Sequence, residues 1–204
     1  MGNFREFIEA ASGLLQGNWV ALDKNKSLAQ GRDKAETWIK GQLSQHGVAI
    51  TGAGQNEDKY MKIDGYWNGQ PVQIKTRTIK PNGRDDIAYE LLKSYVAGQP
   101  IGPQFKEQWR WGRDFKCNAA FYFLLNQSQT HIHQINAADL KAMVSLIVNE
   151  ISPMTITRNY QSRYGADVRC VNDYDAHLHT DRTGYKLLAF IPVQKIVNRS
   201  YPIK

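Results

Sequence analysis

Three residue types that can bind a metal ion and act on a phosphate lie near one another in the chain: Asp64, Gln73 and Lys75. A carboxylate and an amide oxygen are hard ligands that suit Mg²⁺, which keeps several waters and takes few protein groups. A neighbouring ammonium group can stabilise developing negative charge or help activate a metal-bound water. Exposed hairpins often carry the same residue types, and Gly65 after Asp64 could equally mark a strand-end bulge.

The segment between these residues predicts a β-hairpin. Asn68-Gly69 separates two alternating runs, and both residues tolerate the positive φ angles of a two-residue turn. In this register Asp64 lies opposite Gln73 and Lys62 opposite Lys75, with opposed Cβ atoms roughly 4.5–5.5 Å apart. The polar groups therefore share one face. The apolar residues form the other face: Met61, Ile63, Trp67, Val72 and Ile74.

The periodicity of apolar residues predicts the elements that position this hairpin. Helical spacing predicts helices at about residues 4–15, 28–46, 87–95 and 137–149. Asp85 or Asp86 could cap the third of these helices. Apolar runs predict strands at 48–50, 119–126, 131–135 and 186–193, with a polar, irregular stretch before about Tyr185. This order favours an α/β protein with a mixed sheet flanked by helices.

In this order of motifs, the chain resembles the PD-(D/E)XK nuclease superfamily, which has the restriction-endonuclease-like fold. In that family, a helix bearing a Glu precedes a hairpin bearing Asp and then (D/E/Q)-x-K. Here GRDKAETWIKGQL contains Glu36, KIDGYW contains Asp64, and VQIKT contains Gln73 and Lys75. Ile63 stands where the family's name has Pro, and Gln73 replaces the usual acidic residue, as in a QxK minority of the family.

The resemblance covers roughly residues 28–150 and implies an αβββαβ core. It predicts a single nuclease domain over residues 1–204, with a loop-rich candidate specificity region at 151–185 and a closing strand and tail at 186–204. By resemblance, Asp64, Gln73 and the Ile74 carbonyl would hold Mg²⁺, for which Mn²⁺ could substitute. Lys75 would position and activate the attacking water, and Glu36 would act through an outer-shell water or a second metal. The implied reaction is phosphodiester hydrolysis.

Composition limits the class of partner. The chain has 26 Lys and Arg against 19 Asp and Glu, a formal charge of +7, which favours a polyanion such as nucleic acid or an anionic membrane surface. No stretch approaches the roughly 18 to 20 apolar residues of a membrane span. The start, MGNFREFIEA, lacks the apolar core of a signal peptide. Cys117 and Cys170 are too few for a disulfide framework, so we expect a cytoplasmic protein.

Two basic segments are candidates for contact with double-stranded DNA. FKEQWRWGRDFK interleaves aromatic rings that could stack on bases with cations that could meet phosphates, although such stretches are often packing elements. TRNYQSRYGADVR is a candidate for reading base edges, or an ordinary basic loop. The predicted DNA-binding residues are Arg77, Arg110, Arg113, Lys116, Arg158, Arg163 and Arg169.

Two alternatives stay open beside a site-specific DNA endonuclease of the homing, restriction or resolvase type. A non-catalytic nucleic-acid-binding protein could keep the same fold. A zinc protein could use the pairs His131-x-His133 and His177-x-His179, because each pair projects to one face of a strand. By analogy with enzymes that cut two strands, we expect a homodimer or higher homo-oligomer.

Overall fold

The structure is a computed structural model that describes residues 24–54, 56–76, 85–94, 109–126, 128–151, 159–173 and 184–203. The predicted helix at 4–15 lies outside these residues. The helices are α2 (Lys24–Ser44) and α4 (Ala137–Val148), with a π-helical turn at Glu57–Met61 and 3₁₀ helices at Arg113–Lys116 and Val193–Lys195. The strands are β1 (Thr51–Gly52), β2 (Gly65–Trp67), β3 (Gln70–Lys75), β4 (Asp86–Ser94), β5 (Trp109–Trp111), β6 (Phe121–Leu125), β7 (His131–Asn136), β8 (Tyr160–Gln161), β9 (Asp167–Asp173), β10 (Gly184–Pro192) and β11 (Val197–Pro202).

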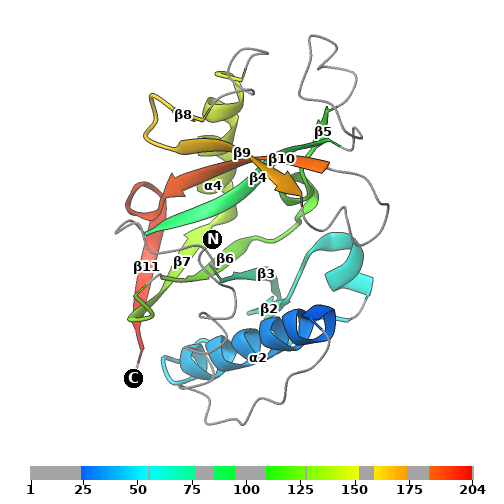
Figure 1. The fold of residues 1–204 in the computed structure, drawn as a ribbon. Coiled ribbons are helices and arrows are strands. Elements are labelled where there is room, and N and C mark those ends of the chain that lie inside the picture. Colours follow the sequence, from blue (N-terminus) through cyan, green and yellow to red (C-terminus); the bar gives the residue numbers. More distant parts are fainter. Residues whose placement is uncertain are drawn as a thin grey trace.

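Within the described residues, the strands form two sheets, and the α/β class is confirmed. Sheet A has six strands in the order β1-β2-β3-β6-β7-β11, and sheet B has five in the order β5-β4-β10-β9-β8. Sheet A is mixed, because β3 and β6 run parallel while its other neighbours are antiparallel. Figure 1 shows α2 along one side of sheet A and sheet B on the other.

Two apolar clusters hold these layers together. The first lies between α2 and sheet A and includes Ile39, Leu43, Val72 and Phe123. The second joins the opposite face of sheet A to sheet B and α4, and Tyr122 belongs to it. Neighbouring residues of β6 therefore point into different clusters, as the period of two in a strand requires. Gln73 and Lys75 of β3 alternate with Val72 and Ile74, so they lie on the face that meets sheet B.

Helix α2 confirms the prediction of a helix near residues 28–46. Ala35, Ile39 and Leu43 recur at four-residue spacing and are buried against sheet A. Gly47 follows with a φ of 77°, a left-handed conformation that glycine adopts without steric cost, and so ends the helical segment. The helix thereby holds its polar border, which carries Glu36, next to the hairpin.

The hairpin and its register are confirmed near the turn. Asn68 and Gly69 have φ angles of 50° and 74°, and Trp67 pairs with Gln70 and Gly65 with Val72. A Cβ at Gly65 would lie 2.2 Å from the Thr51 carbonyl oxygen, so only glycine allows β1 to approach this closely. The alternative of a bulge at Gly65 is wrong, because the ladder from Gly65 to Trp67 is regular.

The predicted pairing of Lys62 with Lys75 is wrong. The chain forms a π-helical turn over Glu57–Met61, and Lys62 ends it in a left-handed conformation with φ 56°. The amide of Ile63 donates to the carbonyl of Glu57 rather than to the opposite strand. Strand pairing therefore begins only after this turn. Met61 and Ile63 precede the paired residues, so they do not share a strand face with Trp67 as predicted.

The predicted helix at 87–95 is also wrong, because residues 86–94 form strand β4. Ile87, Tyr89 and Leu91 alternate into the core between the sheets, a period of two. Eight residues of β4 pair with β10, and this long-range pairing outweighs the local helical spacing. Asp86 consequently lies inside a strand and caps no helix. The crossover between the parallel strands β3 and β6 thus contains strands instead of the expected helix.

The remaining predictions are mostly confirmed, with additions at the C-terminal end. The exception is the strand predicted at 48–50, because the first strand begins at Thr51. Strands β6, β7 and β10 and helix α4 agree with the predicted elements at 119–126, 131–135, 186–193 and 137–149. The stretch predicted to be irregular contains β8 and β9, which complete sheet B. Beyond β10, the predicted tail forms β11 at the edge of sheet A, where it pairs with β7.

Candidate active site

Asp64 lies just before β2 and is held against β3 by three hydrogen bonds. Its amide donates to the Val72 carbonyl at 2.8 Å. Its Oδ2 accepts from the Gln73 side-chain amide at 2.5 Å and from the backbone N–H of Ile74 at 2.6 Å. The predicted opposition of Asp64 and Gln73 is therefore found as a direct contact, and the carboxylate has a fixed orientation.

The surroundings of Asp64 disfavour its negative charge. The pKa of Asp64 is raised from 3.8 to about 6. Burial is the largest cause, and the negative charges of Glu36 and Asp58 add to it, while the hydrogen bonds from Ile74 and Gln73 oppose it. A carboxyl group that is partly buried next to two other carboxylates gains from any nearby positive charge. Raised pKa values of this kind are typical of functional sites, although structural clusters also produce them.

Helix α2 contributes Glu36 to the neighbourhood of Asp64 through Lys40. The Lys40 ammonium lies 2.6 Å from Glu36 Oε1 and donates to the backbone carbonyl of Asp64 at 2.7 Å. Glu36 and Lys40 are one helical turn apart, which places them on the same side of α2. Lys40 therefore fixes the helix to the segment that carries Asp64, and the predicted residue Glu36 lies close enough for its charge to act there.

Lys75 pairs with the carboxylate of Asp114 instead of pointing to Asp64, and the sequence did not indicate this partner. Its Nζ donates to Asp114 Oδ1 at 2.6 Å, and the other oxygen of Asp114 accepts from the backbone N–H of Glu90 at 2.8 Å. Asp114 is only 4% exposed, so this ion pair is well shielded from water. The pair joins β3 of sheet A to β4 of sheet B, and it fixes the position of the ammonium group.

Gln73 has its two polar atoms in different surroundings. Its amide nitrogen faces Asp64, while its Oε1 accepts a long contact of 3.5 Å from the thiol of Cys117. The same thiol donates to the carbonyl of Lys62 at 3.2 Å. A cation bound by Asp64 would require the amide of Gln73 to turn its oxygen inward, a rotation that breaks the hydrogen bond to Asp64 as well as the contact with Cys117.

The predicted residues thus divide into two neighbouring groups. Asp64, Gln73 and Ile74 are brought together, with Glu36 close by, whereas Lys75 is directed to Asp114. In the described part of the chain, no three His, Cys, Asp or Glu side chains form a ready-made metal centre. The donors that do fit Mg²⁺ are one carboxylate, one amide and one backbone carbonyl, which suits an ion that retains its waters.

Asp114 and Lys40 are the residues that sequence reasoning missed. Asp114 lies in the 3₁₀ helix Arg113–Lys116, whose place is fixed by Gly112: a Cβ there would lie 2.0 Å from the carbonyl oxygen of Glu90. No local pattern connects Asp114 with Lys75, since 39 positions separate them. Lys40 had a weak signal, because it follows Glu36 at the spacing of a helical ion pair.

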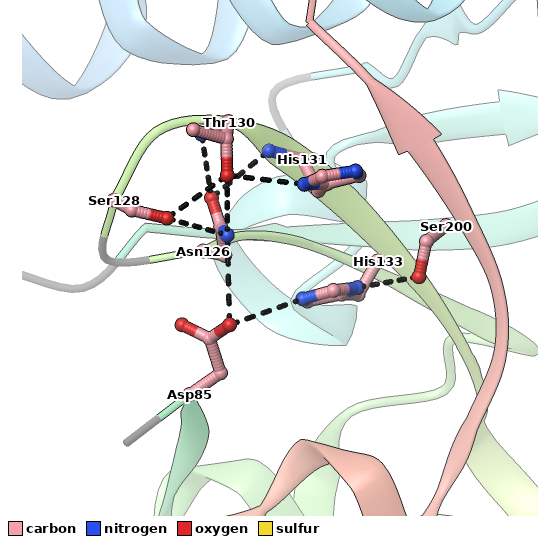
Figure 2. Close-up of polar contacts among 7 residues, drawn as sticks. All are labelled: Asp85, Asn126, Ser128, Thr130, His131, His133 and Ser200. Atoms are coloured by element: carbon pink, nitrogen blue, oxygen red, sulfur yellow. Dashed lines mark hydrogen bonds and ion pairs between the residues drawn. The ribbon is translucent and has the colours of Figure 1, made fainter. Parts of the chain in front are cut away.

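The histidine pair that suggested zinc has other partners (Figure 2). His133 Nδ1 lies 2.8 Å from Ser200 Oγ, and its Nε2 lies 3.6 Å from Asp85 Oδ2. His131 Nδ1 lies 3.0 Å from Thr130 Oγ1, and the two imidazole rings are stacked with centroids 6.3 Å apart. Burial lowers the pKa of His133 against the opposing effect of Asp85. His177 and His179 lie outside the described residues.

Asn126 joins the same network from the end of β6. Its amide donates to Ser128 Oγ at 2.9 Å and to Thr130 Oγ1 at 3.1 Å, and its carbonyl oxygen accepts the amides of Thr130 and His131. Hydrogen bonds of this kind between a side chain and the nearby backbone stabilise a turn, here the turn that connects β6 to β7. The network therefore has a structural account of its own, in which His133 and Asp85 tie sheet A to the start of β4.

The predicted DNA-binding residues fall in several places. Arg77 and Arg158 lie outside the described residues, and the side chains of Arg110 and Arg113 do too. Lys116 is exposed. Arg163 pairs with Glu150 at 2.9 Å, and Arg169 pairs with Asp167 and lies over the ring of Phe190. Arg163 and Arg169 are thus each partly neutralised by a carboxylate.

Comparisons with protein-family profiles, curated proteins and solved structures found no match to this chain. Among the described residues, no helix is both long and apolar enough to cross a membrane.

Proposed function

We propose that this protein is a Mg²⁺-dependent endodeoxyribonuclease of the PD-(D/E)XK type, in its QxK form. The observation that carries the proposal is the state of Asp64, a half-buried carboxyl group with a raised pKa of about 6 beside the charges of Glu36 and Asp58. Such a cluster is unfavourable by itself, and a divalent cation would remove the repulsion. The Gln73 side chain lies at the same place, and its oxygen would become a ligand when the amide rotates.

The order of elements supports the same family. Helix α2, the β2–β3 hairpin and the parallel strand β6 follow the first part of the expected αβββαβ core. Strand β4 takes the place of the second core helix, so the proposed relationship rests on the part of the fold that holds the site. In restriction-endonuclease-like proteins that part carries the catalytic residues.

The proposed reaction is hydrolysis of a DNA phosphodiester bond. Asp64, the Gln73 amide oxygen and the Ile74 carbonyl would hold the cation, with Glu36 in its outer shell. When bound, Mg²⁺ would neutralise charge on the phosphate and acidify water. Lys75, whose ammonium Asp114 holds in place, would orient the attacking water and stabilise the charge that develops on the phosphate oxygens.

The proposed substrate is double-stranded DNA, bound through the excess positive charge of +7. Lys116 is exposed on the 3₁₀ helix that also carries Asp114, so it would meet the backbone near the site. A homodimer would supply the two active sites needed to cut both strands. The dimer and any sequence specificity belong to the proposal by analogy with site-specific nucleases.

A plasmid-cleavage assay tests this function. Wild-type protein should nick or linearise supercoiled DNA with Mg²⁺ or Mn²⁺ and not with EDTA. Asp64→Ala and Lys75→Ala should each reduce the rate by about 10²-fold or more. Matched controls are Asp139→Ala and Lys141→Ala, which remove exposed charges of the same kinds from α4 and should leave the rate unchanged.

Gln73→Glu sharpens this test, because it restores the acidic residue that most of the family has. The variant should reach half of its maximal rate at a lower Mg²⁺ concentration than the wild type, since a carboxylate binds the ion more strongly than an amide. DNA binding without cleavage under any divalent ion would refute the nuclease and support the binding-only alternative. Cleavage that survives Asp64→Ala would place the active site elsewhere.

A further inference from the structure

Exposed apolar side chains gather near the candidate active site. Among the described residues, the large hydrophobic side chains that face solvent are Met61 at 39%, Trp111 at 56%, Phe115 at 36% and Leu146 at 41% exposed. Leu146 lies on α4, away from the site. The other three lie near residues of the site. Trp111 and Phe115 lie on either side of Asp114 in the sequence, and the carbonyl of Met61 accepts from the backbone N–H of Asn118 at 3.2 Å.

Trp111 and Phe115 form one aromatic surface, which we call the aromatic rim. Their ring centroids are 4.7 Å apart with the planes tilted by 49°. Phe115 also meets Tyr89 edge to face at 5.4 Å, and Tyr89 is buried in the core between the sheets. The rim therefore packs against the core on one side and faces solvent on the other. An exposed pair of aromatic rings held on the core is a candidate binding surface.

The local backbone explains why the rim lies beside the ion pair. Gly112 packs closely on the backbone of Glu90, and the following 3₁₀ turn directs Asp114 inward and Phe115 outward. Asp114 binds the ammonium of Lys75 at 2.6 Å, so a single turn of chain links the rim to a proposed catalytic group. Lys116, the next residue, is exposed and supplies a positive charge.

We propose that the aromatic rim stacks on a nucleobase that has left the base stack, next to the phosphate at the active site. This rests on the proposed function, which places a phosphate near Asp64 and Lys75. A stacked strand rises about 3.4 Å per nucleotide along the helix axis, and an unstacked strand is more extended, so a base one or two nucleotides from that phosphate can reach the aromatic rim. Aromatic faces bind any unstacked base, and exposed lysines meet its phosphate.

Stacking on the aromatic rim limits the class of DNA that can bind. Bases inside an intact duplex are stacked on both faces and cannot also stack on Trp111. The preferred substrate is therefore DNA with an unstacked nucleotide beside the cut, such as a single-stranded segment, a bulge or a branch point, or a duplex from which the protein extrudes a base. The tilt between the two rings leaves the face of Trp111 as the larger platform.

Fluorescence of 2-aminopurine tests the proposal without any need for cleavage. The probe is placed in a bulge or a single-stranded segment, and the full-length protein is added in EDTA. Wild-type protein should quench the probe, and it should bind this DNA more tightly than the matched duplex. Trp111→Leu should remove the quenching and weaken binding by about tenfold, whereas Trp111→Phe should retain most of both, because it keeps an aromatic face. Leu146→Ala, which removes an exposed apolar side chain from α4, should change neither quantity.

The outcomes separate this proposal from the nuclease itself. Wild-type quenching and affinity in Trp111→Leu would overturn the aromatic rim, even in a protein that cleaves DNA. Equal losses in Trp111→Leu and Trp111→Phe would overturn stacking as the cause. Aromatic-dependent quenching in a protein that never cleaves DNA would support the rim and refute the nuclease. Absence of any binding to unpaired DNA would overturn the rim.

Discussion

Removing the charge of Asp64 should make the metal-free protein more stable at neutral pH. The pKa of Asp64 is raised from 3.8 to about 6, mainly by burial. The folded state therefore holds this proton more tightly than the unfolded state does. The free energy of unfolding is highest, as far as Asp64 is concerned, below about pH 4, and this contribution is lost as pH rises to about 6. Above about pH 6 the whole penalty applies.

The size of the penalty follows from the pKa difference. A difference of one pKa unit corresponds to about 1.4 kcal/mol, so the ionised carboxylate costs at most about 3 kcal/mol at pH 8. Asparagine keeps an oxygen that can accept from the Ile74 N–H, and it removes the repulsion from Glu36. It loses a charge-assisted hydrogen bond, which offsets part of the gain. We expect Asp64→Asn to raise the free energy of unfolding by about 1–2 kcal/mol at pH 8 and by little at pH 4.

Urea unfolding followed by tryptophan fluorescence measures this effect with and without Mg²⁺. The cation should stabilise wild-type protein, by about 2.7 kcal/mol at 100 times its dissociation constant, because it binds only the folded state. Asp64→Asn should lose this increment. Asp139→Asn, which changes an exposed carboxyl group on α4, should behave as the wild type in both buffers.

The expected effect is refuted if Asp64→Asn is no more stable than the wild type at pH 8 and Mg²⁺ stabilises the variant as much as the wild type. That result would mean that neither the burial of the carboxylate nor its neighbours create a cation site at Asp64. Stabilisation by Asp64→Asn without any effect of Mg²⁺ on the wild type would leave the electrostatic account intact and refute the metal site.

Three further predictions test the surroundings of the site. If Asp114 acts by positioning Lys75, Asp114→Asn should lower the single-turnover cleavage rate about tenfold without changing DNA affinity, and should have no further effect in a Lys75→Met background; additive effects would indicate a separate role. Gly65→Ala should lower the free energy of unfolding by about 2–4 kcal/mol because its Cβ would clash with β1, whereas Gly52→Ala has open space; equal midpoints in urea would contradict this. Burial lowers the pKa of His133 below its usual 6.5, so the unfolded state takes up a proton first, and stability should fall as pH drops below about 6.5. His133→Gln should flatten that slope, and an unchanged slope would assign it to other groups.

The hairpin could be predicted from sequence because its determinants are local. Asn68-Gly69 fixes the turn through the φ preferences of two adjacent residues, and the turn fixes which residues oppose one another. The contact of Asp64 with Gln73 follows from that register. The prediction failed at Lys62, because the chain forms a π-helical turn over Glu57–Met61 although the side chains there alternate as they would in a strand.

Strand β4 shows why the rest of the fold could not be predicted in the same way. Ile87 and Leu91 are spaced by four residues, as on a helix, but with Tyr89 they also alternate as on a strand. Both periods fit the same residues, and the choice is made by pairing with β10, about a hundred residues later in the chain. The partner of Lys75 depends on the same choice, since Asp114 is bound by the backbone of β4.

The ionisable side chains around the site carry more negative than positive charge when they are counted together. The network contains the carboxylates of Glu36, Asp58, Asp64 and Asp114 and the ammonium groups of Lys40 and Lys75. Four negative and two positive groups leave a formal charge of −2 when Asp64 is ionised. Relative to the PD-(D/E)XK pattern that the sequence resembles, Gln73 lacks one negative charge beside Asp64, while Asp114 adds one beside Lys75. The cluster thus keeps an excess of two negative charges, which a divalent cation would neutralise. Asp114→Asn should weaken Mg²⁺ binding less than Asp64→Asn, because Asp114 is already paired with Lys75 at 2.6 Å.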